Sequence, residues 1–215
     1  MINTDNALLF DLDGTVLNTD ELIFRTFKYT FKKFLPEYTL TQEELLSFLG
    51  PSLKDSFSRY LPSEKVEEAI KVYRQYNYEK HNDYVTLYPQ ETEVLEKLYQ
   101  KGYKMAIVTT KYTDTAVYGL KSFGLDKYFK VVIGSDQVTH GKPHPEAVLE
   151  ALKKLNMDKG YMIGDNVTDI LAGKNADIHT IGVTWSLKGT QDILDAHPDY
   201  MMESYEDLLD YLERM

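Results

Sequence analysis

The sequence contains no cysteine, which excludes disulfide bonds, thiolate metal sites and cysteine nucleophiles. It also has no apolar run long enough to span a bilayer, so we expect no membrane-spanning segment. The opening residues, MINTDNALLF, lack the basic start and apolar centre of a signal peptide. We therefore expect a cytoplasmic protein.

Basic residues are in the minority, with 24 Lys and Arg against 34 Asp and Glu and a formal net charge of −10. Nucleic acids and membrane surfaces are polyanions, so we expect neither as a partner. A small anionic substrate stays compatible with this charge, because a local group of cations or a bound metal outweighs it over a few ångströms.

The order of elements predicts an α/β fold with an inserted helical segment. A strand is expected at Ala7–Phe10, and a helical stretch follows from about residue 19 to residue 84. Beyond it, helices alternate with short strands in the segments YKMAIVTT, KVVIGS, GYMIGD, HTIGV and YMMES. This alternation predicts a Rossmann-like parallel sheet covered on both faces. We expect residues 1–15 and 83–215 to form the core and residues 16–82 a helical cap.

Start signals are visible for several helices of the cap. Thr39 and Thr41 precede QEELLSFLG, and Ser63 precedes EKVEEAI, in each case with a glutamate nearby as in a capping box. Asp20 and Glu21 are expected to form the acidic first turn of the first cap helix.

Polar residues follow four of the predicted strands. In an open parallel sheet, ligands bind beyond the carboxyl ends of the strands, where these side chains are expected to converge. The candidates, in chain order, are Asp11 and Asp13, then Thr109, Thr110 and Lys111, then Lys142, and finally Asp165 and Asp169.

Each candidate taken alone has a simpler reading. Asp11 and Asp13 are compatible with a helix cap or an Asx-turn, Thr109 with a strand-end hydroxyl, and Lys142 with a solvated loop lysine. A calcium-binding EF-hand loop fails, because its required glycine and glutamate positions hold Val16 and Leu22. The ordered placement of all the candidates on successive strand ends favours a shared site.

The segments FDLDGTVLNTD, VTT, GKPHPE and GDNVTD resemble the four motifs of the haloacid dehalogenase superfamily in their usual order. The insertion after the first motif resembles the helical cap of one subfamily. The DxD form of the first motif is typical of the phosphotransferase members, so Asp13 argues against dehalogenation.

The resemblance implies a Mg²⁺-dependent reaction through an aspartyl-phosphate. Asp11 is then the nucleophile and Asp13 the acid and base. Lys142 and Thr109 hold the phosphoryl oxygens. The metal is held by Asp11, the Asp13 carbonyl and Asp165, while Asp169 orients a metal-bound water or Lys142.

Other positions are less specific. Thr110 and Lys111 are candidates for substrate binding, although a surface lysine explains Lys111 equally well. His144 is expected to be structural, and the remaining histidines, His81, His140, His179 and His197, show no ligand spacing. Trp185 is expected to serve packing.

The expected substrate is a small phosphorylated metabolite. Gly50 and Ser52, in FLGPSLKDSF, are candidate substrate residues, with a structural turn as the alternative. This segment resembles the corresponding loop of phosphoglycolate phosphatases and, more closely, of bacterial pyrophosphatases. A β-phosphoglucomutase-like phosphotransferase and a non-catalytic phosphate-binding module stay open as alternatives. We expect a monomer or a weak homodimer.

Overall fold

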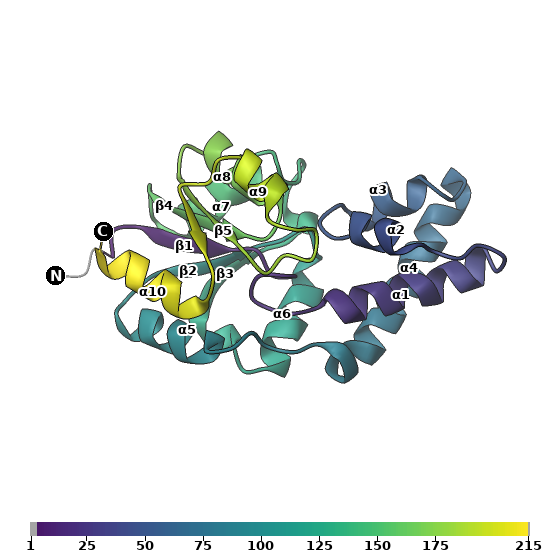
Figure 1. Cartoon of the computed structure of the whole chain (residues 1–215), viewed down its shortest axis with the longest axis horizontal. Coiled ribbons are helices and arrows are strands. Elements are labelled where there is room, and N and C mark those ends of the chain that lie inside the picture. The colour runs from purple at the N-terminus through teal and green to yellow at the C-terminus, as the bar shows by residue number, and fades with distance from the viewer. Residues whose placement is uncertain (1–3, 215) are drawn as a thin grey trace. The chain divides into compact units, whose positions relative to one another are not determined.

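The computed structural model describes residues 4–214, in which six strands form one parallel sheet of order β3-β2-β1-β4-β5-β6 (Figure 1). The strands are β1 (Ala7–Phe10), β2 (Met105–Val108), β3 (Phe129–Ile133), β4 (Gly160–Gly164), β5 (His179–Val183) and β6 (Tyr200–Met202). Every residue of β1, β2 and β4 is buried, which explains their continuous apolar runs. The predicted Rossmann-like α/β class is confirmed.

Helices cover both faces of this sheet, with α7 and α8 on one face and α5 and α10 on the other (Figure 1). The core helices are α5 (Glu91–Gln100), α6 (Thr113–Ser122), α7 (Glu146–Leu155), α8 (Val167–Asn175), α9 (Gln191–Asp195) and α10 (Tyr205–Arg214), and two 3₁₀ turns lie at Asp126–Tyr128 and Ser135–Gln137. In the described part of the chain, no helix is both long and apolar enough to cross a membrane.

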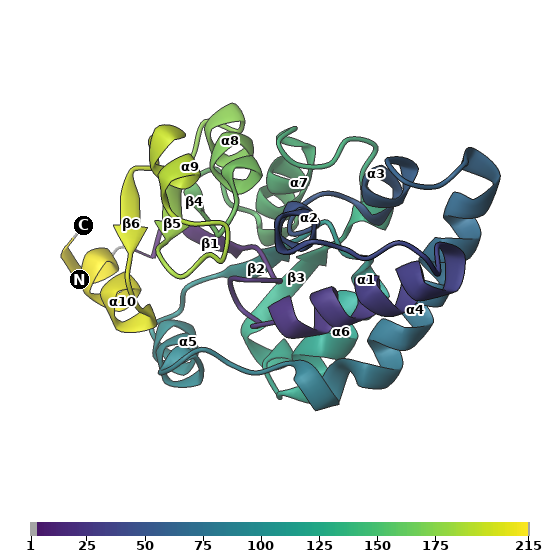
Figure 2. The same ribbon diagram turned by 45° about the vertical axis from the view of Figure 1, so that its right-hand side comes forward.

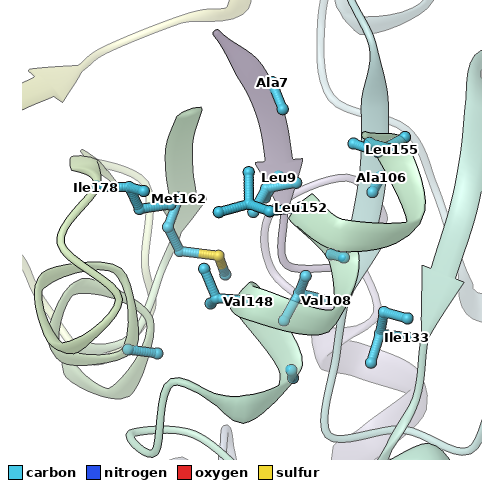
Figure 3. Close-up of a cluster of buried hydrophobic side chains, with 13 residues drawn as sticks. Ala7, Leu9, Ala106, Val108, Ile133, Val148, Leu152, Leu155, Met162 and Ile178 are labelled. Carbon is cyan, nitrogen blue, oxygen red and sulfur yellow. The ribbon is translucent and has the colours of Figure 1, made fainter. Parts of the chain in front are cut away.

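The face under α7 shows how alternation along a strand builds the core. Alternate residues of β1 and β2 point to this face, where they meet Val148 and Leu152 of α7 (Figure 3). These strand residues are Ala7, Leu9, Ala106 and Val108, and all four are fully buried. The residues between them in sequence supply the opposite face.

The chain divides into two compact units, one made of the residues up to Leu17 and from Leu87 onward, the other of Asn18–Thr86. The second unit holds α1 (Asp20–Phe34), α2 (Gln42–Ser47), α3 (Leu53–Ser58) and α4 (Ser63–Tyr84). Within it, α1 packs antiparallel to α4 (Figure 2). Phe27 of α1 stacks on Phe48 with ring centroids 4.0 Å apart, and it also contacts Phe57 and Tyr73.

The predicted helix starts met different outcomes. Thr41 forms the expected capping box with Glu44 ahead of α2, and Asp20 and Glu21 open α1. The capping box expected at Ser63 was wrong. Pro62 is the N-cap residue there, and Ser63 already lies in α4 with its hydroxyl donating to Glu64. The fixed φ of proline suits an extended N-cap, which lets the helix begin one residue earlier.

Glu91, in the first turn of α5, is a carboxylic acid with no exposed surface. Its Oε2 accepts the Tyr88 N–H at 3.1 Å, whereas its buried Oε1 has no hydrogen-bond partner. Burial raises the pKa of Glu91 to about 8, although the bond from Tyr88 acts in the opposite direction. The folded protein therefore holds a proton on Glu91 that the unfolded chain releases near pH 4.5.

We predict that Glu91→Gln changes how stability depends on pH. Between pH values of about 4.5 and 8, Glu91 binds more protons in the folded state, so its contribution falls as pH rises, by up to about 1.4 kcal/mol per pH unit. The glutamine variant lacks this loss and should be the more stable protein at pH 8, with the advantage vanishing towards pH 4.5. Urea unfolding at a series of pH values checks this, with the exposed Glu93→Gln on the same helix as control. A stability difference that does not vary with pH would contradict the assignment.

Candidate functional site

The first predicted site residues directly follow the strands, and backbone hydrogen bonds to the neighbouring strands hold them in place. β1 lies between β2 and β4 at the point where the strand order reverses, which is where open α/β sheets bind ligands. The Asp11 N–H donates to the Ile163 carbonyl at 2.8 Å, and the Thr109 N–H donates to the Ile133 carbonyl at 3.0 Å. Asp165 follows β4 directly. Three adjacent strands thus deliver Asp11, Thr109 and Asp165 to one edge of the sheet.

Lys142 reaches this edge from the segment between β3 and α7. Its Nζ lies 3.0 Å from Asp11 Oδ1 and 2.5 Å from Asp169 Oδ1, and it donates to the Val108 carbonyl at 3.0 Å. The Lys142 side chain is only 3% exposed. The ammonium is therefore fixed by three oxygens, which belong to the residue after β1, to the last residue of β2 and to α8.

Burial dominates the electrostatics of this group. It raises the pKa of Asp11 to about 7, against the lowering effect of the Lys142 ammonium, while the Asp169 carboxylate raises it further. Burial acts to lower the pKa of Lys142, but Asp11 and Asp169 outweigh it and hold this pKa above its ordinary value. Lys142 is consequently a permanent cation in the site.

Three buried carboxylates, those of Asp11, Asp165 and Asp169, offer oxygens within 4.8 Å of one another. The Lys142 ammonium contacts two of these carboxylates, those of Asp11 and Asp169. Carboxylate oxygens are the donors that hard divalent cations prefer. This set of oxygen donors fits Mg²⁺.

Glycine is required at two positions beside these acids. A Cβ at Gly164 would lie 2.2 Å from Asp169 Oδ2, and one at Gly14 would lie 2.4 Å from Asp165 Oδ2. Gly14 also has a positive φ of 78°, which L side chains rarely adopt. The close packing of backbone on carboxylate explains why the motifs read DLDG and GD.

Asp13 and Lys111 form a second ion pair at the same edge. Lys111 Nζ donates to Asp13 Oδ1 at 2.6 Å, with the lysine side chain 14% exposed. The Thr109 hydroxyl accepts the Lys111 N–H at 3.2 Å, which shapes the turn after β2. Thr110 lies between them and is half-buried. Lys111 is therefore not the free surface lysine of the alternative reading.

Two aromatic residues from the C-terminal part of the chain hold the loop after Asp13. Trp185 Nε1 donates to the Gly14 carbonyl at 3.0 Å, and the buried Tyr205 hydroxyl donates to the Thr15 carbonyl at 2.8 Å. Their rings stack with centroids 5.9 Å apart. The sequence indicated packing for Trp185 but gave no signal for its hydrogen bond or for Tyr205, because both depend on contacts across more than 170 residues.

Gly50 and Ser52 belong to the helical unit. Gly50 has a positive φ of 100°, and Ser52 is the N-cap of α3, where its Oγ accepts the Asp55 N–H at 3.1 Å. The hydroxyl of Ser52 also donates to Asp55 Oδ2 at 2.6 Å. Both residues thus have a local structural task, and their contact with substrate stays a prediction.

The sequence indicated no ligand spacing for His140, but the structure places this residue beside His144 and Glu146. His140, His144 and Glu146 each place one potential ligand atom within 4.8 Å of the others. Spacing along the sequence did not reveal this group, because the ordinary i, i+4 rule applies to helices and both histidines precede α7.

Known proteins of similar sequence indicate the family of this chain. The family model described as haloacid dehalogenase-like hydrolase matches residues 8–183, a range that includes all of the site residues predicted from the sequence. Pyrophosphatase PpaX of Listeria monocytogenes is 48% identical over 205 residues, covering 94% of each chain. Pyrophosphatase PpaX of Bacillus pumilus is 44% identical over 210 residues, covering 96% of each.

Solved structures give the same result. A haloacid dehalogenase-like hydrolase from Streptococcus pneumoniae matches with a TM-score of 0.85 at 30% identity, covering 97% of this chain and 98% of that one. The family that the four motifs indicated is thereby confirmed, and the structural similarity extends over nearly the whole chain. This chain is a hydrolase, and it belongs to the haloacid dehalogenase-like hydrolase family.

Proposed function

We propose that this phosphatase hydrolyses inorganic pyrophosphate in a Mg²⁺-dependent reaction, with Asp11 as the nucleophile. The observation that carries the proposal is the contact of 3.0 Å between the Lys142 ammonium and Asp11 Oδ1 at the carboxyl end of the central strand. A phosphoryl group brought to Asp11 meets this cation at the same time, which is the arrangement that phosphoryl transfer requires.

The two oxygens of Asp11 are assigned different tasks. Oδ1 accepts both the Leu12 N–H at 2.8 Å and the Lys142 contact, which orient the carboxylate. Oδ2 then attacks phosphorus, and the bond from phosphorus to the leaving phosphate oxygen breaks, which gives an aspartyl-phosphate. Lys142 and Thr109 hold the oxygens of the transferred group.

Asp13 moves the proton in both halves of the reaction. Asp13 starts the cycle protonated and donates this proton to the leaving phosphate oxygen in the first half. In the second half it accepts a proton from the attacking water, which releases the second phosphate and restores both Asp11 and the protonated Asp13. The bond from Lys111 fixes the Asp13 carboxyl group, and the bonds from Trp185 and Tyr205 fix the loop behind it.

Mg²⁺ would be held by the Asp11 and Asp165 carboxylates and the Asp13 carbonyl, where it would neutralise the phosphate charge. Asp169 contacts Lys142 directly and accepts the Asn166 N–H at 3.0 Å, which suits an orienting role better than direct ligation. The Thr15 hydroxyl lies 3.5 Å from Asp165 Oδ1, and the side-chain Nδ2 of Asn166 donates to the same oxygen at 3.0 Å.

Pyrophosphate is favoured over phosphoglycolate by the relatives named for it at 48% and 44% identity. Both substrates are small polyanions that Lys142 and the metal would attract. Gly50 and Ser52 in the helical unit stay candidates for recognising the leaving group, because the core residues act on the phosphoryl group itself.

We predict that Asp11→Asn lowers kcat for pyrophosphate by on the order of 10⁴-fold or more, because the amide is a poor nucleophile. Phosphate release with pyrophosphate, phosphoglycolate and β-glucose 1-phosphate, each with and without Mg²⁺ or a chelator, checks both substrate and metal. Mass spectrometry of acid-quenched wild-type protein should find a phosphoryl group on the peptide that carries Asp11.

The matched control is Asp177→Asn, since Asp177 is exposed and its φ of 57° suits asparagine. It should keep full activity. Undiminished turnover by Asp11→Asn, or turnover unaffected by the chelator, would refute the mechanism. Preferred formation of glucose 6-phosphate from β-glucose 1-phosphate would replace the hydrolase by a mutase.

We predict that Lys111→Met lowers kcat by about 10²-fold and changes KM much less, because the displaced carboxylate of Asp13 no longer lies where the proton is transferred. Lys111→Arg should restore part of kcat by supplying another cation. Steady-state kinetics with pyrophosphate provide the measurement, and the exposed Lys121→Met on α6 is the control. A rise in KM with unchanged kcat would assign Lys111 to substrate binding instead.

A further inference from the structure

A group of two histidines and a glutamate lies outside the carboxylate site, on the segment that leads from β3 into α7. His140 Nδ1 lies 3.0 Å from Glu146 Oε2, and His144 Nδ1 lies 3.9 Å from the same oxygen. The two imidazole rings have centroids 4.6 Å apart. We propose that His140, His144 and Glu146 form a binding site for a divalent transition-metal ion such as Zn²⁺, Co²⁺ or Ni²⁺.

The spacing of the ligand atoms agrees with a single metal ion. Zinc binds imidazole nitrogen and carboxylate oxygen at about 2.0–2.2 Å, so two tetrahedral ligands lie about 3.4 Å apart. The distances of 3.0 Å and 3.9 Å from the two Nδ1 atoms to Glu146 Oε2 lie on either side of this value. Each of the three residues also offers a ligand atom that lies within 4.8 Å of those of the other two. Small rotations of exposed side chains suffice to adjust them.

Local hydrogen bonds prepare two of the three ligands. Glu146 Oε1 accepts the Thr139 N–H at 2.8 Å and Oε2 accepts the His140 N–H at 2.9 Å, so the carboxylate is held over the loop. His144 Nδ1 accepts the Glu146 N–H at 3.2 Å. This bond orients the His144 ring beside the carboxylate, and a metal ion on Nδ1 would take the place of the N–H group.

The chemistry of the donors separates this site from the carboxylate group around Asp11. Imidazole nitrogen favours zinc, cobalt and nickel, whereas an all-oxygen site favours Mg²⁺. The side chains of His140 and His144 are 62% and 51% exposed, so the metal can enter from solvent and water can complete its coordination. The inference does not depend on the proposed substrate.

Binding here should stabilise the segment that carries Lys142. His140 and His144 lie two residues before and two after this lysine, and Glu146 opens α7. One ion that joins both sides of the segment to the helix binds the folded state in preference to the unfolded one, so it raises the melting temperature. Metal binding and thermal stability therefore provide two measurements that need no turnover.

The experiment uses the full chain without a polyhistidine tag and with Mg²⁺ in excess to compete for the carboxylate site. Co²⁺ is titrated and followed by its visible absorption, and Zn²⁺ by calorimetry and by the melting temperature. The variants are His140→Ala, His144→Ala and the double substitution, with circular dichroism to verify folding. His197→Asn is the histidine control, since His197 is exposed and its φ of 53° suits asparagine. Asp165→Asn tests the carboxylate site.

We expect one Zn²⁺ per chain and a higher melting temperature with Zn²⁺. Each single histidine variant should bind Zn²⁺ at least about tenfold more weakly, and the double variant should lose both the Co²⁺ absorption and the thermal shift. His197→Asn and Asp165→Asn should keep them. The proposal is overturned if the double variant binds as the wild type does, if binding is lost in Asp165→Asn instead, or if no saturable binding occurs in the presence of Mg²⁺.

Discussion

The buried Lys142 ammonium is the interaction on which the core arrangement depends. It joins Asp11 after β1, the last carbonyl of β2 and Asp169 on α8, so it connects three elements that are far apart in sequence. Removing one partner of such a buried group leaves an uncompensated charge, which destabilises proteins by about 3–5 kcal/mol. The same cation that links these strand ends faces the proposed nucleophile. Structural and chemical requirements therefore fall on one residue, and the site is preorganised by the fold.

Lysines held at the site explain how a chain with a net negative charge can bind an anionic substrate. The net charge of −10 is spread over the molecule and is screened beyond about 10 Å at ordinary salt. Lys142 and Lys111 instead act at contact distance and from largely buried positions, with side chains 3% and 14% exposed. Their carboxylate partners hold both ammonium groups in place. The positions of these ammonium groups, and not the net charge of the chain, therefore determine how the site interacts with small anions.

Much of the core could be predicted from the sequence because its signals are local. The buried strands are continuous apolar runs, each followed by acids or hydroxyls, and Gly14 and Gly164 are required by carboxylates that lie against the backbone. Tyr205, the hydrogen bond of Trp185 and the pairing of Lys111 with Asp13 could not be predicted. They depend on the three-dimensional arrangement of residues from distant parts of the chain. The cap expected at Ser63 was wrong because a proline one residue earlier also suits an N-cap.

The segment before α7 shows why a motif in sequence underdetermines a site. In GKPHPE the lysine turns inwards and is buried, whereas His144 and the preceding His140 face solvent on the same few residues. The sequence shows these residues as one continuous segment. In the structure, however, Lys142 belongs to the carboxylate site, and the two histidines lie beside Glu146. Glu146 connects the two, because it accepts N–H groups from the residues just before Lys142 and opens the helix just after it. A ligand bound by the two histidines and Glu146 would thus act on the backbone that positions Lys142, without contacting the carboxylates of Asp11, Asp165 and Asp169.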